Sequence, residues 1–219
     1  MKLKVMLILL FLIYRFWFAT VPSATKPEGE QINLNVISDW NCVKDKNGIR
    51  LFERWIKLSN ELNVRERKGE MILDCNYTKT VSYLGQTHTI KDWMKSVTVV
   101  EPAGSESESL TLKHIVFQLP WPLDNRDVIA LYNVYPINEN RTVISVVSSE
   151  SGTEYPGIVR IKVYRATWNI EKISTASTKI IFTTFSDEPP LFPLWIQEPV
   201  IKREYFNNLS RLKLQLENL

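Results

Sequence analysis

The 219-residue sequence predicts an α+β fold, in which a strongly curved antiparallel sheet is crossed by a long carboxyl-terminal helix. Three observations predict this class. Apolar segments typical of strands follow one another between short turn signals from residue 97 to residue 185. Within 158–170 the apolar residues change phase, which indicates a bend in a curved sheet. Near the end of the chain, one helix face is marked by apolar residues three or four apart, namely Ile201, Tyr205, Leu209, Leu212 and Leu216.

The first elements expected are a hairpin, a third strand and a helical region. The hairpin joins 40–43 to 49–58, because Asn47-Gly48 readily supplies the positive φ angles of a tight turn. The third strand covers 64–73. Residues 76–94 have a helical pattern that Gly85 divides into two shorter pieces, and Trp93 lies at the end of this region.

The middle of the chain is expected to be a meander of strands. Within 128–135 both alternating sets of side chains are largely apolar, so both faces of that strand are expected to avoid water. The phase change within 158–170 predicts a bulge or bend near Tyr164 and Arg165. The predicted strands are 97–100, 110–119, 128–135, 142–149, 158–170 and 179–185.

The carboxyl-terminal helix is expected to follow a proline-rich segment, with Pro199 in its first turn. Its apolar stripe predicts packing against the sheet. The concave face of such a sheet encloses an apolar cavity unless side chains fill it, and cavities of this kind are common ligand sites. The pattern leaves both states open.

The amino-terminal 24 residues differ from the rest of the chain. Lys2 and Lys4 precede an apolar run that is followed by small residues, which is typical of a secretory signal peptide. An uncleaved membrane anchor is the alternative, although Arg15 interrupts the run. Residues 1–24 are thus predicted to be a signal peptide or anchor, 25–31 a linker, and 32–219 the folded domain, either exported to the periplasm or medium or tethered to a membrane.

Composition excludes several classes of function. Without the three cations of residues 1–24, the chain carries 24 cations and 24 acids, so nucleic-acid binding is not expected. Two histidines and two cysteines are too few for a three-histidine or four-cysteine zinc site, and the glycine motifs for dinucleotides and phosphates are missing. No cofactor or metal is therefore expected. Cys42 and Cys75 either pair in an oxidising compartment or stay free as apolar fillers.

The segment L-P-W-P-L-D-N-R-D-V at 119–128 resembles the START family of StAR-related lipid-transfer domains, most closely its phosphatidylcholine-transfer-type members. Further segments agree in the same order, and the resemblance covers residues 32–219. They are N-G-I-R-L-F at 47–52, the helical region ending in Trp93, G-I-V-R at 157–160 and P-L-W-I at 193–196.

The resemblance implies a helix-grip fold of the START/Bet v 1-like kind, whose sheet encloses a tunnel for one lipid. It implies a monomer that binds a lipid, contacts membranes transiently and transfers its ligand between them. This chain departs from the family at Tyr132, where sterol- or phosphatidylcholine-carrying members commonly have an arginine. It departs also at Met94 and at 189–191, where prolines replace a glycine pair.

Six residues are the candidates for the cavity or its entrance. Tyr132 is expected to offer a hydroxyl to a polar ligand atom. Arg126 is expected to anchor a loop or to contact the ligand. The aromatic candidates are expected to line the cavity, act as a lid or gate, touch a membrane, or pack in the core. They are Trp93, Trp121, Phe192 and Trp195.

Two other functions stay open at this stage. One is a cyclase- or hydrolase-like enzyme acting on a hydrophobic substrate in the same cavity, with His114 as the better of two candidate general bases. No catalytic motif accompanies it, so an isolated, satisfied histidine is the preferred interpretation. The other is a regulatory module whose own side chains fill the cavity. Arg160, on a predicted strand between Val159 and Ile161, is expected to face solvent.

Overall fold

The computed structural model describes residues 34–59, 61–104, 110–119, 121, 123–150, 154–188 and 192–219. The predicted segments 1–24 and 25–31 lie outside the described residues. The elements run in the order β1 (Asn35–Val36), β2 (Asn41–Lys46), β3 (Ile49–Lys57), β4 (Asn63–Leu73), α2 (Tyr77–Gly85), a 3-10 turn η1 (Thr87–Thr89), α3 (Ile90–Trp93), β5 (Val97–Pro102), β6 (Leu110–Phe117), β7 (Asn125–Asn138), β8 (Arg141–Ser148), β9 (Ile158–Arg160), β10 (Tyr164–Lys172), β11 (Thr178–Ser186) and α4 (Leu194–Glu217).

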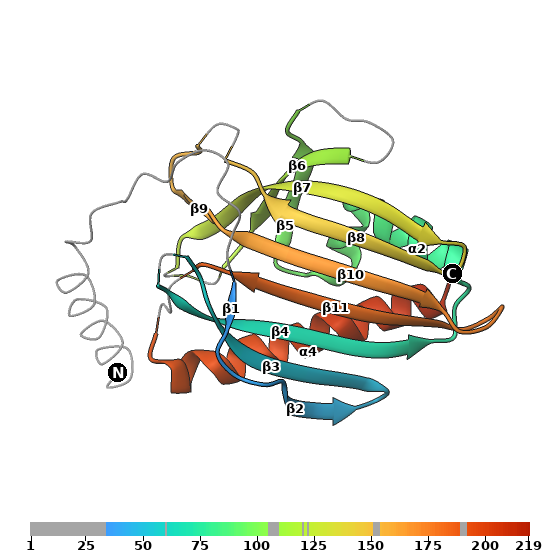
Figure 1. The fold of residues 1–219 in the computed structure, drawn as a ribbon. Coiled ribbons are helices and arrows are strands. Elements are labelled where there is room, and N and C mark those ends of the chain that lie inside the picture. Colours follow the sequence, from blue (N-terminus) through green and yellow to red (C-terminus); the bar gives the residue numbers. More distant parts are fainter. Residues whose placement is uncertain are drawn as a thin grey trace. The chain divides into compact units, whose positions relative to one another are not determined.

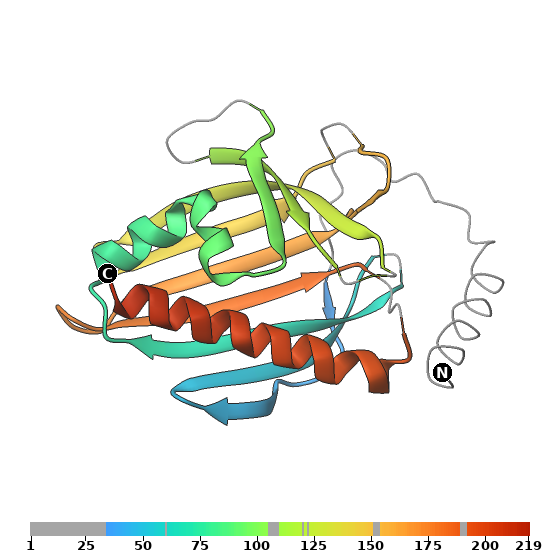
Figure 2. The same ribbon diagram turned by 180° about the vertical axis from the view of Figure 1, so that it is seen from behind.

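The described strands form one sheet of eleven, and helices α2 and α4 lie on the same face of it (Figure 1, Figure 2). The strand order is β1-β3-β4-β11-β10-β8-β7-β6-β5, with β2 added to β3 and β9 added to β7. Only the pairing of β9 with β7 is parallel among these strands. The predicted antiparallel sheet with a helix across it is confirmed.

Local sequence explains the first half of the chain. Asn47 and Gly48 have φ angles of 54° and 71°, so they form the tight turn predicted between β2 and β3. Helix α2 begins after Asn76, whose side-chain oxygen accepts a hydrogen bond from the Thr78 amide at 2.8 Å. The helical region is divided after Gly85, as predicted, into α2 and a shorter η1–α3 piece that ends at Trp93.

The predicted strand 158–170 is wrong as one element, because it is divided into β9 and β10 with residues 161–163 between them. At the break, the Ser148 hydroxyl donates to the Lys162 carbonyl at 2.8 Å and accepts from the Tyr164 amide at 3.0 Å. A side chain thus takes the place of a ladder hydrogen bond, and β9 pairs with β7 instead of β8. The interruption begins before Tyr164, earlier than the predicted bend.

Helix α4 begins at Leu194, so Pro199 lies within its second turn and not in the first turn, where it was expected. The proline has no N–H, and it therefore removes one helical hydrogen bond there. The buried residues of α4 pack in the core against the sheet. They are Phe206, Leu209, Leu212 and Leu216. Gly69 of β4 permits this approach, because a Cβ atom at that position would overlap Leu209 Cδ1.

Candidate functional site

A small cavity lies between the α2–α3 region and the central strands of the sheet. Its volume is about 30 Å³, which is room for roughly two water molecules. The helical side of its wall comprises Leu84, Thr89, Ile90, Trp93 and Met94. The sheet side comprises Ile115, Phe117, Val128, Tyr132, Val146, Tyr164, Ala166, Trp168 and Phe182.

Aromatic side chains account for the small volume. Trp168 stacks on Phe182 with ring centroids 3.8 Å apart, and Phe182 stacks on Tyr205 of α4 at 5.9 Å. Trp93 meets Trp168 edge-on at 5.7 Å. This aromatic cluster connects α3 with α4 across β10 and β11. A ligand larger than a few atoms therefore has to displace part of it.

No charged side chain lines the cavity in the part of the chain that the structure describes, and one polar group there lacks a partner. Trp93 is only 3% exposed, and its indole N–H forms no hydrogen bond with a described residue. By contrast, the Thr89 hydroxyl donates to the Gln86 carbonyl at 2.7 Å. Burial raises the pKa of Tyr132 well above its ordinary value, and the neighbouring Tyr164 adds to the rise. Burial raises the pKa of Tyr164 as well, so the hydroxyls of Tyr132 and Tyr164 stay protonated and neutral.

Of the six predicted candidates, the structure brings Trp93 and Tyr132 together in the cavity wall. The other four do not line it. Arg126 is buried, and its guanidinium donates to Glu188 Oε1 at 2.6 Å and to the Asp124 carbonyl at 2.7 Å. It therefore holds the start of β7 to the segment after β11. Burial, together with the nearby charge of Asp187, raises the pKa of Glu188 above its ordinary value although Arg126 acts to lower it.

The remaining three candidates lie in the segments beside β7 and α4. Trp121, in the connection from β6 to β7, is 91% exposed, and Trp195, in the first turn of α4, is 78% exposed. Phe192 is half-buried just before α4, where its amide donates to Gln197 Oε1 at 3.2 Å. Neither tryptophan packs in the core. Their exposure leaves both available for contact with another surface.

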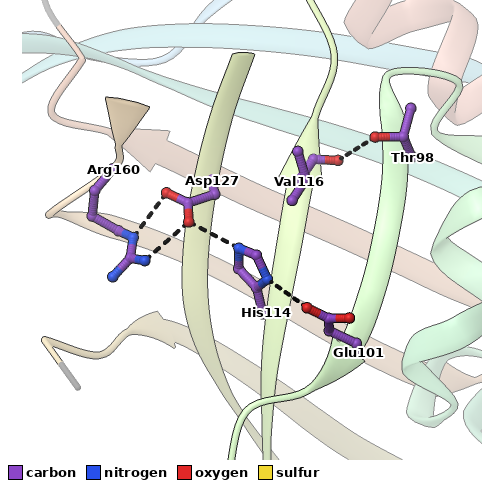
Figure 3. Close-up of polar contacts among 6 residues, drawn as sticks. All are labelled: Thr98, Glu101, His114, Val116, Asp127 and Arg160. Atoms are coloured by element: carbon purple, nitrogen blue, oxygen red, sulfur yellow. Dashed lines mark hydrogen bonds and ion pairs between the residues drawn. The ribbon is translucent and has the colours of Figure 1, made fainter. Parts of the chain in front are cut away.

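A polar network on the other face of the sheet was missed at the level of sequence (Figure 3). His114 Nδ1 lies 3.0 Å from Glu101 Oε1, and His114 Nε2 lies 2.8 Å from Asp127 Oδ2. Arg160 then donates to both oxygens of Asp127, at 2.8 and 2.9 Å. Glu101 lies thirteen residues before His114, and Asp127 lies thirteen residues after it. This spacing does not predict contact by itself, because contact depends on the register of β5, β6 and β7.

The network corrects two expectations. Arg160 does not face solvent: its side chain is 12% exposed, because the parallel pairing of β9 places it opposite Asp127. His114 is satisfied but not isolated, since both ring nitrogens contact carboxylates and Tyr155 stacks on the ring at 4.6 Å. It does not line the cavity, so it is poorly placed to act as a general base on a ligand there.

The described residues contain no group of three histidine, cysteine, aspartate or glutamate side chains placed to hold a metal ion. Cys42 is exposed, Cys75 is buried, and the two are free. Within the same residues, no helix is both long and apolar enough to cross a bilayer.

No protein-family model matches the sequence, and no curated protein matches it either. Solved structures do match its fold, and StAR-related lipid-transfer domains are prominent among them. A StAR-related lipid transfer protein from Xanthomonas axonopodis is 20% identical, with a TM-score of 0.69 over 81% of this chain and 98% of that one. Human StAR-related lipid transfer protein 5 is 15% identical, with a TM-score of 0.71 over 83% of this chain and 88% of that one.

A more distant match is the Zhui aromatase/cyclase from a Streptomyces species, which is 11% identical with a TM-score of 0.52 over 70% of this chain and 94% of that one. Identities this low establish the fold alone. The described domain therefore has the helix-grip fold of the START/Bet v 1-like structures, in which a curved antiparallel sheet holds a carboxyl-terminal helix.

Proposed function

We propose that this protein binds one lipid or similar hydrophobic molecule between its α2–α3 region and its sheet, and transfers it between membranes. The observation that carries the proposal is an uncharged, largely apolar cavity with the buried and unpaired Trp93 N–H in its wall. An unpaired buried donor costs free energy of about 1–3 kcal/mol, which a bound acceptor atom would recover. The fold shared with lipid-transfer proteins supports the same assignment.

Binding requires the cavity to enlarge, and the helical side of its wall is the part that can move. The strands opposite are tied to one another by their ladders. The α3 side is instead held to α4 by a hydrogen bond from Arg211 Nε to the Trp93 carbonyl at 2.9 Å. Outward movement of α3 would carry Trp93 away from Trp168 and open the aromatic cluster. Each Å² of ligand surface buried then contributes about 25 cal/mol.

The cavity wall favours an uncharged ligand that carries a hydrogen-bond acceptor. A charged or zwitterionic head group buried there would find no opposite charge, and burial of an unpaired charge is costly. An acceptor such as a carbonyl or hydroxyl oxygen would suit the Trp93 N–H and the Tyr132 hydroxyl. Phosphatidylcholine, which is carried by the family members that the sequence most resembles, is therefore the alternative ligand. It requires the head group to lie outside the described wall.

Trp121 and Trp195 are proposed to contact the membrane during transfer, because tryptophan is favoured at the interface between lipid and water. We propose that the protein acts as a monomer and that residues 1–24 export it or tether it to a membrane.

The small volume of the cavity favours a second function, that of a regulatory module whose aromatic cluster is its permanent filling. One experiment separates the two. Full-length protein is purified, extracted with organic solvent and examined by mass spectrometry. It is also incubated with phosphatidylcholine vesicles that contain cholesterol and diacylglycerol. The proposal predicts about one neutral lipid per protein, and a Tyr132→Arg variant should instead favour phosphatidylcholine because it adds a buried cation.

Retention of phosphatidylcholine by the parent protein would overturn the neutral-ligand assignment while leaving lipid binding in place. No lipid in the extract and none taken up from vesicles would favour the filled module. Conversion of the bound molecule into a product would favour an enzyme.

A further inference from the structure

We propose that His114 is a proton-operated clamp on the edge strand β5: its imidazole ties β5 to β7 when both ring nitrogens are protonated, and it releases β5 when one proton is lost. The inference concerns the outer face of the sheet and does not depend on the ligand of the cavity.

The geometry requires two donors on one ring. Glu101 lies against Nδ1 at 3.0 Å and Asp127 against Nε2 at 2.8 Å (Figure 3). An ionised carboxylate only accepts hydrogen bonds, so each nitrogen must carry a proton to satisfy its neighbour. Neutral imidazole has one N–H and one lone pair, so it satisfies only one of the two carboxylates.

The environment decides which contact is lost. Asp127 is 1% exposed, and Arg160 holds it with two hydrogen bonds. Burial by itself would raise the pKa of Asp127, but the hydrogen bonds and electrostatic interactions with Arg160 and His114 together lower the pKa below its ordinary value. Asp127 therefore stays ionised and keeps the proton on Nε2. The Glu101 side chain is 51% exposed and can turn to water, so the proton that leaves is the one on Nδ1.

The groups that face His114 come from each neighbouring element. Glu101 belongs to β5 and Asp127 to β7, while Tyr155, in the turn before β9, stacks on the ring. Arg160 of β9 acts through Asp127, and the charge of Glu154 lies near Arg160. Among these side chains, histidine is the one whose charge ordinarily changes between about pH 5 and 8.

Release of Glu101 matters because β5 is the last strand of the sheet. It pairs with β6 alone among the described strands, and its register with β6 shifts between Val97 and Val99. Loss of the Nδ1 proton turns a lone pair toward the Glu101 carboxylate, so an attraction between β5 and β6 becomes a repulsion. Residues 94–96 connect the start of β5 to α3, whereas Glu101 lies near the other end of the strand, so the clamp acts on the end of β5 away from α3.

The full-length chain suits a direct test, because it contains only two histidines. A His88→Gln variant, changed at an exposed position, leaves His114 as the single imidazole. Nitrogen-15 NMR between pH 5 and 8.5 then reports both ring nitrogens. Hydrogen exchange of the Ala103 amide, which donates to the Leu112 carbonyl at 2.9 Å, reports the end of β5. The Lys172 amide, bonded to the Asn140 carbonyl at 2.8 Å, is the reference.

The clamp predicts that both nitrogens are protonated at low pH and that Nδ1 alone loses its proton as the pH rises. The protection factor of the Ala103 amide should fall about tenfold over the same range while that of Lys172 stays constant. Glu101→Gln should abolish this pH dependence and keep β5 protected, because an amide can accept from Nδ1–H or donate to neutral Nδ1. His114→Gln should leave the Ala103 amide poorly protected at every pH.

An imidazole that titrates without any change at Ala103 would overturn the proposal, and so would a ring that loses its Nε2 proton first. Should His114→Gln fail to fold, Glu101→Gln at its half-exposed position still decides the matter. A pH dependence in that variant equal to that of the parent contradicts the clamp.

Discussion

Strands β6 and β7 present two different kinds of interior on their two faces. On the face toward α2 and α3, Ile115 and Val128 line an uncharged cavity in which the Trp93 N–H has no partner. On the opposite face, the preceding residues His114 and Asp127 belong to a network whose charged groups are paired. The unpaired donor marks a place for a ligand atom, whereas the paired charges mark a place where strands are held together. Adjacent residues of the same strand thus contribute to the two sites, because their side chains point to opposite faces of the sheet.

The largest expected effect comes from breaking the outer face. Asp127→Ala removes the common partner of His114 and Arg160 and leaves a buried imidazole and a largely buried guanidinium without their carboxylate. We expect the free energy of unfolding to fall by about 3–5 kcal/mol, measured by urea denaturation of the full-length chain at pH 6. Asp127→Asn, which keeps the shape and one acceptor, should lose less. A loss below about 1 kcal/mol for the alanine variant would contradict a structural role for the network.

The matched change on the inner face is Val128→Ala, one residue further along β7. Val128 is fully buried in the cavity wall, and removing two of its carbons should lower the free energy of unfolding by about 2 kcal/mol. The larger cavity should also bind the neutral dye Nile red more tightly than the parent does, as measured by fluorescence titration. If this variant is as unstable as Asp127→Ala, the proposed difference between the two faces is wrong.

Features decided by neighbouring residues were predictable from sequence. The turn between β2 and β3 is formed by Asn47 and Gly48 themselves, and the break in the helical region falls at Gly85. Arg160 was mispredicted because strict alternation was assumed around it, whereas Val159 is exposed and Ile161 is buried. Its partner Asp127 lies 33 residues earlier and becomes its neighbour only through the one parallel pairing among the described strands.

The candidate site was predictable only in part for the same reason. Trp93 and Tyr132 were named, and both line the cavity. The aromatic filling by Trp168 and Phe182 was missed, because the contact between β10 and β11 side chains depends on the register of the two strands. Whether a concave sheet is open or filled depends on this packing, and local pattern does not determine it.

The loss of stability at acid pH should also depend on the polar network of the outer face, through Asp127. Because the pKa of Asp127 is lower in the folded protein than in the unfolded chain, its ionised form stabilises the fold above the ordinary aspartate value of about 3.9. That contribution is lost as the pH falls through the lower, folded-state pKa. Thermal unfolding followed from pH 6 to pH 2 should therefore show a decline in midpoint below about pH 4. Asp127→Asn should reduce the decline, and an unchanged profile in this variant would assign the loss of stability at acid pH to other carboxylates.

The smallest effect on stability is expected at Trp93, and there it distinguishes a ligand site from a structural one. Trp93→Phe removes an unpaired N–H, which favours the folded state, and leaves a small void, which opposes it. The free energy of unfolding should therefore change by less than about 1 kcal/mol. Affinity for the neutral lipid found by extraction should nevertheless fall about fivefold, because one hydrogen bond of about 1 kcal/mol is lost.

Leu214→Ala, at an exposed position of α4 outside the cavity wall, is the control and should alter neither quantity. A Trp93→Phe variant that loses stability while it keeps full affinity would place Trp93 with the structural groups of the outer face. The unpaired N–H would then result from the packing of the aromatic cluster and would not mark a ligand site. The proposed functional difference between the two faces of the sheet would be wrong.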